Sequence, residues 1–231
     1  MTNPDSYKLI FTDLINVYQE NQAYDPKPEY LRVLDIANGW FLQVHHGCLA
    51  IIGLEENGLG AVTAPLRRSV VEHLVALKWL VHDGEAIIDP LKRNVDYGLK
   101  KIQSAIDKAG WSRLEEDKLE KIAKSAAKAE RTMDHLLQFV ARAHRVDAVH
   151  DIVAYLRETS YSHPSVESAG LFIPYIEGAD GRDIDQYGFC CIYLFEAHLA
   201  FNELIVDSPW VDKLLALRER ITGLSDAKGR D

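Results

Sequence analysis

The chain has few of the features that mark a disulfide scaffold, a zinc site or a membrane protein. It holds 3 cysteines in 231 residues, and two of them are adjacent at Cys190 and Cys191, so neither a disulfide framework nor a paired CxxC motif is present. No apolar run reaches the roughly 18 residues that cross a bilayer, and the N-terminus lacks the basic and apolar regions of a signal peptide. We therefore expect a cytoplasmic protein with no membrane partner.

Basic residues are also in the minority. Lys and Arg number 26 against 35 Asp and Glu, which gives a formal net charge of −9. Sequence-independent binding of nucleic acid depends on clustered Lys and Arg, so this charge disfavours a nucleic-acid partner while leaving a local basic patch open. The densest basic stretch, 118–131, interleaves lysines with glutamates, which is typical of a solvated helix.

Sustained alternation of apolar and polar residues, the pattern of a strand, does not occur. Apolar residues instead recur at intervals of three to four over 33–51 and again over 184–206, which indicates helices. The sequence therefore predicts an all-α helical bundle of about eight or nine helices, with helix in more than about 60% of residues. We expect a single α-helical domain over 1–224 and a frayed polar tail over 225–231. The expected helices span roughly 5–21, 28–56, 63–83, 90–109, 112–128, 130–143, 147–162, 184–206 and 209–222.

Proline, glycine and capping residues set the expected boundaries. Ser112 with Glu115 fits a capping box that opens one helix, Gly110 fits the end of the helix before it, and Gly223 fits the end of the last. The stretch 164–183 reads as one long loop, and loops of that length are more often lids or binding loops than connectors. Its only extended candidate, 171–176, contains a proline that restricts it to an edge or a loop.

A polar cluster interrupts the otherwise apolar helix 63–83. Arg68 and Glu72 share one face with Trp79 in helical projection, and His73 lies at the edge of the opposite, apolar face. Charged groups rarely enter a core unpaired. Two interpretations stay open for Arg68 and Glu72, a structural i,i+4 ion pair and the wall of a pocket. His73 is interpreted as a satisfied core histidine or as part of the same pocket.

A second polar cluster ends the helix 147–162. His163 precedes Pro164, which disfavours helical geometry, so its side chain is free to swing into a cleft. We predict that Arg68 and Glu72 are mostly buried and that one of them contacts Tyr161 or His163. If the pair is buried, Arg68→Ala should cost roughly 3 to 5 kcal/mol. On this helix a polar stripe is expected at His150, Ala154, Arg157 and Tyr161. The core-facing residues are expected to be Val149, Ile152, Val153 and Leu156.

These segments resemble a known group of proteins. The runs that carry the resemblance are Arg68-Ser-Val-Val-Glu72-His73, with Trp79 after it, and Arg157-Glu-Thr-Ser160-Tyr-Ser162-His163-Pro164. They look like an uncharacterised family of all-helical bacterial proteins, a domain of unknown function common in actinobacteria. The resemblance covers about 30–205 and implies a helical fold in which the two segments meet; it implies no activity. More distantly, the chain is similar to HEPN domains, helical bundles whose toxin and defence members can be metal-independent ribonucleases.

The HEPN resemblance implies a catalytic motif of an Arg and a His separated by about four to six residues. Four pairs match it, which are Arg67 and Arg68 with His73, Arg145 with His150, and Arg157 with His163, where composition alone gives roughly 1.5. A nuclease would use His150 or His163 as acid or base and Arg145, Arg157 or Arg68 to stabilise phosphate charge. We expect no metal and no cofactor, since no Glu-x-x-His spacing and no phosphate loop occur.

Two functions from different classes follow. The favoured one is a non-enzymatic sensor or interaction module whose polar seam binds a small molecule or fixes helix register. That seam comprises Arg68, Glu72, His73, Tyr161 and His163. The alternative is a HEPN-like metal-independent ribonuclease or nucleotide-acting defence or stress protein. The negative net charge and the near-chance number of Arg–His pairs disfavour this alternative. Whether the protein is an enzyme stays open, and a homo-oligomer is compatible with either function.

Overall fold

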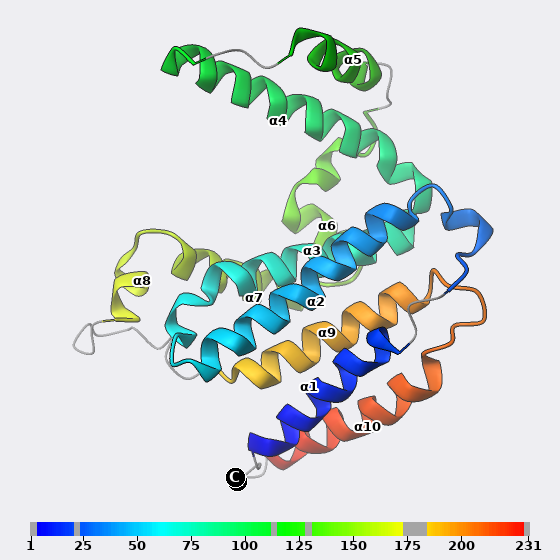
Figure 1. The fold of residues 1–231 in the computed structure, drawn as a ribbon, viewed down its shortest axis with the longest axis vertical. Helices are drawn as coiled ribbons and strands as arrows, with labels where there is room; N and C mark the ends of the chain where they lie inside the picture. The colour runs from blue at the N-terminus through cyan, green and yellow to red at the C-terminus, as the bar shows by residue number, and fades with distance from the viewer. Residues whose placement is uncertain (1–3, 21–23, 112–114, 128–130, 173–183, 229–231) are drawn as a thin grey trace.

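The computed structural model describes residues 4–20, 24–111, 115–127, 131–172 and 184–228, and it is helical almost throughout (Figure 1). About 80% of the described residues are helical, and the described ranges contain no strand beyond one isolated bridge between Pro26 and Ile205. The predicted all-α class and helix content are therefore confirmed. None of the described helices combines the length and the apolar character that crossing a membrane requires.

The described ranges contain α-helices and short 3-10 turns. The α-helices are α1 Pro4–Gln19, α2 Leu34–Glu56, α3 Ala64–Asp83, α4 Ile88–Ala109, α5 Glu116–Ala127, α6 Phe139–Arg145, α7 His150–Ser162, α8 Val166–Gly170, α9 Gln186–Asn202 and α10 Val211–Lys228. The 3-10 turns are Pro28–Tyr30, Gly60–Val62, Gly84–Ile87 and Asp134–Leu137.

The core lies between α2, α3 and α9. Helix α9 is buried around most of its circumference, as the dense apolar pattern of that segment predicts for a central helix. Helices α1 and α10 cover α9 on one side, and α7 packs on α3 on the other (Figure 1). At one end of the core, Phe201 stacks on Trp210 with ring centroids 5.7 Å apart and contacts Phe41 at 4.9 Å. Large aromatic surfaces removed from water here stabilise the packing of α2, α9 and the start of α10.

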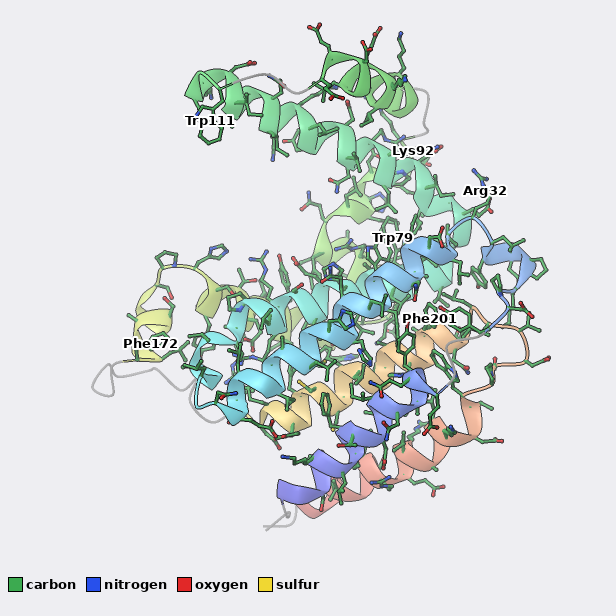
Figure 2. The ribbon with its side chains drawn as sticks, in the orientation of Figure 1. Arg32, Trp79, Lys92, Trp111, Phe172 and Phe201 are labelled. Atoms are coloured by element: carbon green, nitrogen blue, oxygen red, sulfur yellow. The ribbon has the colours of Figure 1, made fainter. Side chains whose placement is uncertain are left out.

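Helices α4 and α5 form an arm that projects from the core (Figure 1). In the described residues, α4 packs on the 3-10 turns Gly84–Ile87 and Asp134–Leu137, and α5 packs on α4. Gly110 ends α4 in the left-handed conformation, as predicted. The arm leaves apolar side chains open to solvent, among them Val95, Ile102 and Trp111, of which Trp111 is labelled in Figure 2.

Three helix boundaries differ from the predictions. The helix expected from residue 28 begins at Leu34, after a separate 3-10 turn. The helix expected over 130–143 is divided at Gln138, whose ψ of 132° is extended. The last helix does not end at Gly223 but continues to Lys228, so the tail predicted from residue 225 is helical over its first part. A glycine inside a surface helix costs only about 1 kcal/mol, which is too little to end it.

The stretch 164–183 is also not one uninterrupted loop. Ser165 caps the short helix α8, accepting from the backbone N–H of Ser168 while the Ser168 hydroxyl accepts from the Ser165 N–H. The predicted capping box at Ser112 and the part of the loop over 173–183 lie outside the described residues.

Helix α7 is turned about its axis relative to the prediction. Val153, expected in the core, is 71% exposed, and Val149 and Leu156 are exposed as well. The buried face instead carries two carboxylates, Asp151 and Glu158. These charges can enter the interior because partners from α3 and α9 meet them there. The exposed valines and leucine of α7 leave an apolar stripe open, and the homo-oligomer considered from the sequence stays a prediction.

Candidate functional site

A buried ion pair joins α3 to α7. The guanidinium of Arg67 donates from Nε to Glu158 Oε2 over 2.9 Å, and its Nη2 lies 2.7 Å from the same oxygen. Both side chains are at least 95% buried. A lone charge at this depth would lose several kcal/mol of hydration, so each member of the pair depends on the other.

Two neutral groups complete the surroundings of Arg67. Its Nη1 donates to the Thr63 hydroxyl and, over 3.1 Å, to Gln186 Oε1. Thr63 precedes α3 and sits one helical turn before Arg67, so the local helix brings the two together. Gln186 is the first residue of α9. One guanidinium therefore connects the start of α3, the end of α7 and the start of α9.

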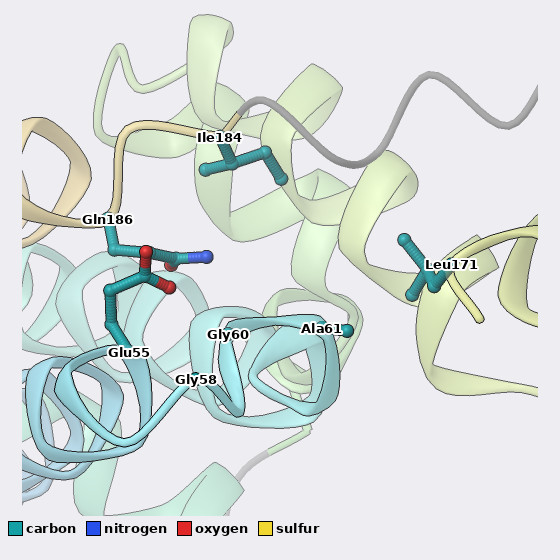
Figure 3. A pocket seen from close by; sticks show the side chains of 7 residues that line it. All are labelled: Glu55, Gly58, Gly60, Ala61, Leu171, Ile184 and Gln186. Carbon is teal, nitrogen blue, oxygen red and sulfur yellow. The ribbon is translucent and has the colours of Figure 1, made fainter. Parts of the chain in front are cut away.

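The amide of Gln186 has a defined orientation. A guanidinium has donors and no acceptor, so the carbonyl oxygen of the amide must face Arg67. The Nε2 end therefore points away from the ion pair, toward a pocket between the α2–α3 turn and the start of α9 (Figure 3). A buried ion pair thus fixes a hydrogen-bond donor at the wall of an accessible pocket.

This pocket has a volume of about 230 Å³ and a mixed polar and apolar wall. It is lined by Glu55, Gly58, Gly60, Ala61, Leu171, Ile184 and Gln186. Glu55 and Gln186 lie side by side at its edge (Figure 3). A side chain at Gly60 would overlap the Glu55 carboxylate, so the glycine leaves room for the carboxylate at this edge.

The predicted polar seam lies on the other side of the α3–α7 junction. Arg68 Nη1 is 3.2 Å from His163 Nε2, which confirms the predicted contact between the two segments. Arg68 also reaches Glu72 Oε1 at 3.4 Å and the Tyr155 hydroxyl at 3.3 Å. The Arg68 and Glu72 side chains keep 27% and 34% of their exposure, so the predicted burial is partial. The seam is a half-exposed surface cluster.

The other members of the predicted seam are separate from this cluster. His73 Nδ1 lies 2.7 Å from the Ser69 carbonyl one turn earlier, so its ring is satisfied within its own helix. Tyr161 faces Arg157, whose guanidinium carbon is 5.9 Å from the ring centroid, in cation–π geometry. The five seam residues therefore do not converge on one pocket.

The Arg–His pairs of the HEPN-type motif have other partners in the structure. Arg145 Nη2 is 2.7 Å from Asp83 Oδ1, whereas the exposed His150 has its Nε2 3.5 Å from Asp151 Oδ1. His163 contacts Arg68 instead of Arg157.

Sequence reasoning missed Glu55, Glu158 and Gln186 of the candidate site, and it considered Arg67 only as a member of an Arg–His pair with His73. A signal for the burial of Arg67 was present, since this residue lies within the apolar face of α3, where a charge requires a buried partner. Its partner is 91 positions away, and no local pattern marked it.

No protein-family model matches the chain, and neither the curated proteins nor the solved structures give a match.

Proposed function

We propose that the protein is a non-enzymatic binding module that takes a small molecule in the pocket beside Gln186. The observation that carries the proposal is the orientation of the Gln186 amide, with its oxygen on Arg67 and its nitrogen at the pocket wall. A donor fixed in advance loses little conformational entropy when a ligand binds. A volume of about 230 Å³ suits a small molecule or the polar head of a larger one.

The same connection supports a sensor role. A ligand that pulls on the Gln186 amide acts on the Arg67 guanidinium, which also holds Glu158 at the end of α7. Coupling of this kind requires that the ligand favour one arrangement of the three helices over another. In the proposed module, occupancy of the pocket would shift how α7 and α9 pack on α3.

Filling the pocket tests the proposal. Ala61 is exposed and lines the pocket, so Ala61→Phe should occupy it at little cost in stability. We expect a screen of small polar fragments by amide NMR to find ligands that shift the signals of Gly60, Ala61 and the Gln186 side chain. Ala61→Phe should weaken the affinity for these ligands at least about tenfold.

The control is Ala105→Phe, which places the same side chain on an exposed position of the projecting arm. It should leave every fragment affinity unchanged. A screen in which no fragment shifts the pocket signals, or in which Ala61→Phe binds as the wild type does, would contradict the proposal.

The Arg68–His163 contact supports a second candidate function, the HEPN-like metal-independent ribonuclease or nucleotide-acting protein. The guanidinium and the imidazole lie 3.2 Å apart at the half-exposed cluster, so both could reach a phosphate, one to stabilise its charge and one to move a proton. The net charge of −9 and the separate partners of Arg145 and His150 favour the binding module.

Incubation with labelled RNA and a chelator distinguishes the two candidates. We expect no cleavage by freshly purified wild type, because a net charge of −9 disfavours binding of a phosphate backbone. Cleavage that persists with chelator, is lost in His163→Ala and is unchanged in His150→Ala would instead establish the nuclease. Cleavage lost in His150→Ala alone would assign the reaction to the pair predicted from the motif.

A further inference from the structure

A larger apolar groove adjoins the pocket beside Gln186. Its volume is about 440 Å³, and it shares Ala61 and Leu171 with the smaller pocket. It runs between the start of α3 and α8, and its remaining lining residues are Val62, Ala64, Pro65, Tyr161, Pro164, Ser165, Ser168, Ala169 and Phe172. The polar pocket and the apolar groove therefore adjoin at Ala61 and Leu171, and we call the two together the two-part site.

The polar end of the two-part site carries a negative charge, that of Glu55. Glu55 is exposed at the pocket wall, and among the described residues no Lys or Arg forms an ion pair with it. The neighbouring Glu56 is engaged elsewhere, because its Oε1 accepts from Lys8 Nζ over 2.6 Å and from the Tyr187 hydroxyl over 2.7 Å. The charge offered to a ligand in the pocket is thus that of Glu55.

The apolar end can bury a hydrocarbon body. Phe172 is 64% exposed (Figure 2), and Val62, which also lines the groove, is exposed as well. A ligand lying there would remove these surfaces from water, which contributes roughly 0.8 kcal/mol for each methylene fully buried. The groove supplies no charged side chain to hold a polar tail.

We propose that the two-part site binds an amphipathic cation, a primary ammonium with an apolar chain or ring behind it. The ammonium pairs with the Glu55 carboxylate, and the apolar body lies along the groove past Ala61 and Leu171. An ammonium has no acceptor, so the fixed Gln186 N–H does not bind the charged head itself and is left for an acceptor atom beside it. Charge complementarity selects this class, because Glu55 would repel a carboxylate or phosphate head, and the net charge of −9 attracts cations at long range. This inference rests on the proposed binding function and names its ligand class.

Calorimetric titration with four probes tests the inference on the full chain. The probes are hexylamine, 1-hexanol, hexanoate and ethylamine. The first three have six carbons and a head that is positive, neutral or negative, and ethylamine keeps the positive head but lacks most of the apolar tail. We expect hexylamine to bind about three- to fivefold tighter than hexanol, as a partly exposed ion pair allows, and hexanoate to bind most weakly. Ethylamine should bind at least about tenfold more weakly than hexylamine.

Matched variants assign each preference to its residue. Glu55→Gln should abolish the preference for hexylamine over hexanol, whereas Glu56→Gln should keep it. Phe172→Ala should reduce the advantage of hexylamine over ethylamine, while Trp111→Ala, which removes an exposed aromatic side chain from the arm, should not.

The outcomes separate this inference from the function on which it rests. If hexylamine, 1-hexanol and hexanoate bound equally well, and equally to Glu55→Gln, the proposal that the ligand is a cation would be wrong. The proposed binding function would still stand if Ala61→Phe abolished that binding. The absence of binding by all four probes would overturn the ligand class, while the fragment screen would judge the pocket separately.

Discussion

Replacement of Arg67 by alanine is expected to lower the free energy of unfolding by about 3 to 5 kcal/mol, the usual loss when one partner of a buried ion pair is removed. The Glu158 carboxylate would stay in the interior without its only described cationic partner, and Gln186 and Thr63 would lose a donor. Urea denaturation followed by circular dichroism measures the change, provided that the unfolding is two-state.

The adjacent arginine provides the control. The Arg68 side chain is half-exposed, so Arg68→Ala should cost only about 1 kcal/mol or less. The sequence predicted a loss of roughly 3 to 5 kcal/mol for replacing a buried Arg68, and the structure leads us to expect that loss for Arg67→Ala instead. A double variant, Arg67→Met with Glu158→Met, should be more stable than Arg67→Ala, because no charge is left unpaired. Equal losses in Arg67→Ala and Arg68→Ala would contradict the interpretation.

Acidification from pH 7 to pH 4.5 is expected to destabilise the protein through two buried histidines. Burial lowers the pKa of His198 to about 4, and the nearby His45 lowers it further. The hydrogen bond from His198 Nδ1 to the Leu194 carbonyl, over 2.7 Å, acts in the opposite direction but does not offset burial. Burial likewise lowers the pKa of His45 to about 4, and His46 contributes. Neither ring nitrogen of His45, nor Nε2 of His198, has a hydrogen-bond partner in the described part of the chain.

The sign follows from proton uptake on unfolding. An unfolded histidine has a pKa of about 6.5, so below that pH the unfolded chain binds protons that folded His45 and His198 exclude. Their contribution is complete above pH 6.5 and is lost as the pH falls toward 4. For His198, a shift from 6.5 to about 4 corresponds to about 3 kcal/mol in total, most of which is lost by pH 4.5.

Urea denaturation at several pH values checks this prediction. His198→Leu should remove a large part of the loss of stability between pH 7 and pH 4.5, since leucine has no proton to gain. His144→Leu, at an exposed histidine on α6, should leave the pH dependence as in the wild type. An unchanged pH dependence in His198→Leu would show that other groups cause the acid sensitivity.

The sequence by itself determined which segments are helices and which of them are central. Spacing within a segment is a local property, and segment 184–206 is apolar in nearly every direction, so α9 could only be stable when surrounded. The two polar clusters also predicted that the segments containing Arg68 and His163 meet, and they do.

The tertiary structure alone decided which of two adjacent arginines is buried. Arg67 and Arg68 point to different sides of α3, and a charge enters the interior only where an opposite charge arrives from elsewhere. Glu158 arrives from α7, 91 residues away, and that pairing also turned the valines of α7 outward against its apolar pattern.

The candidate site was decided in the same way. Gln186 meets Arg67 across 119 positions, and the pocket draws its wall from the α2–α3 turn, from Leu171 and from the start of α9. Each residue alone is an ordinary polar or small side chain in its own segment. Only the packing of α3, α7 and α9 gives the Gln186 amide one orientation, because the guanidinium that fixes it is itself held by a carboxylate from a third helix.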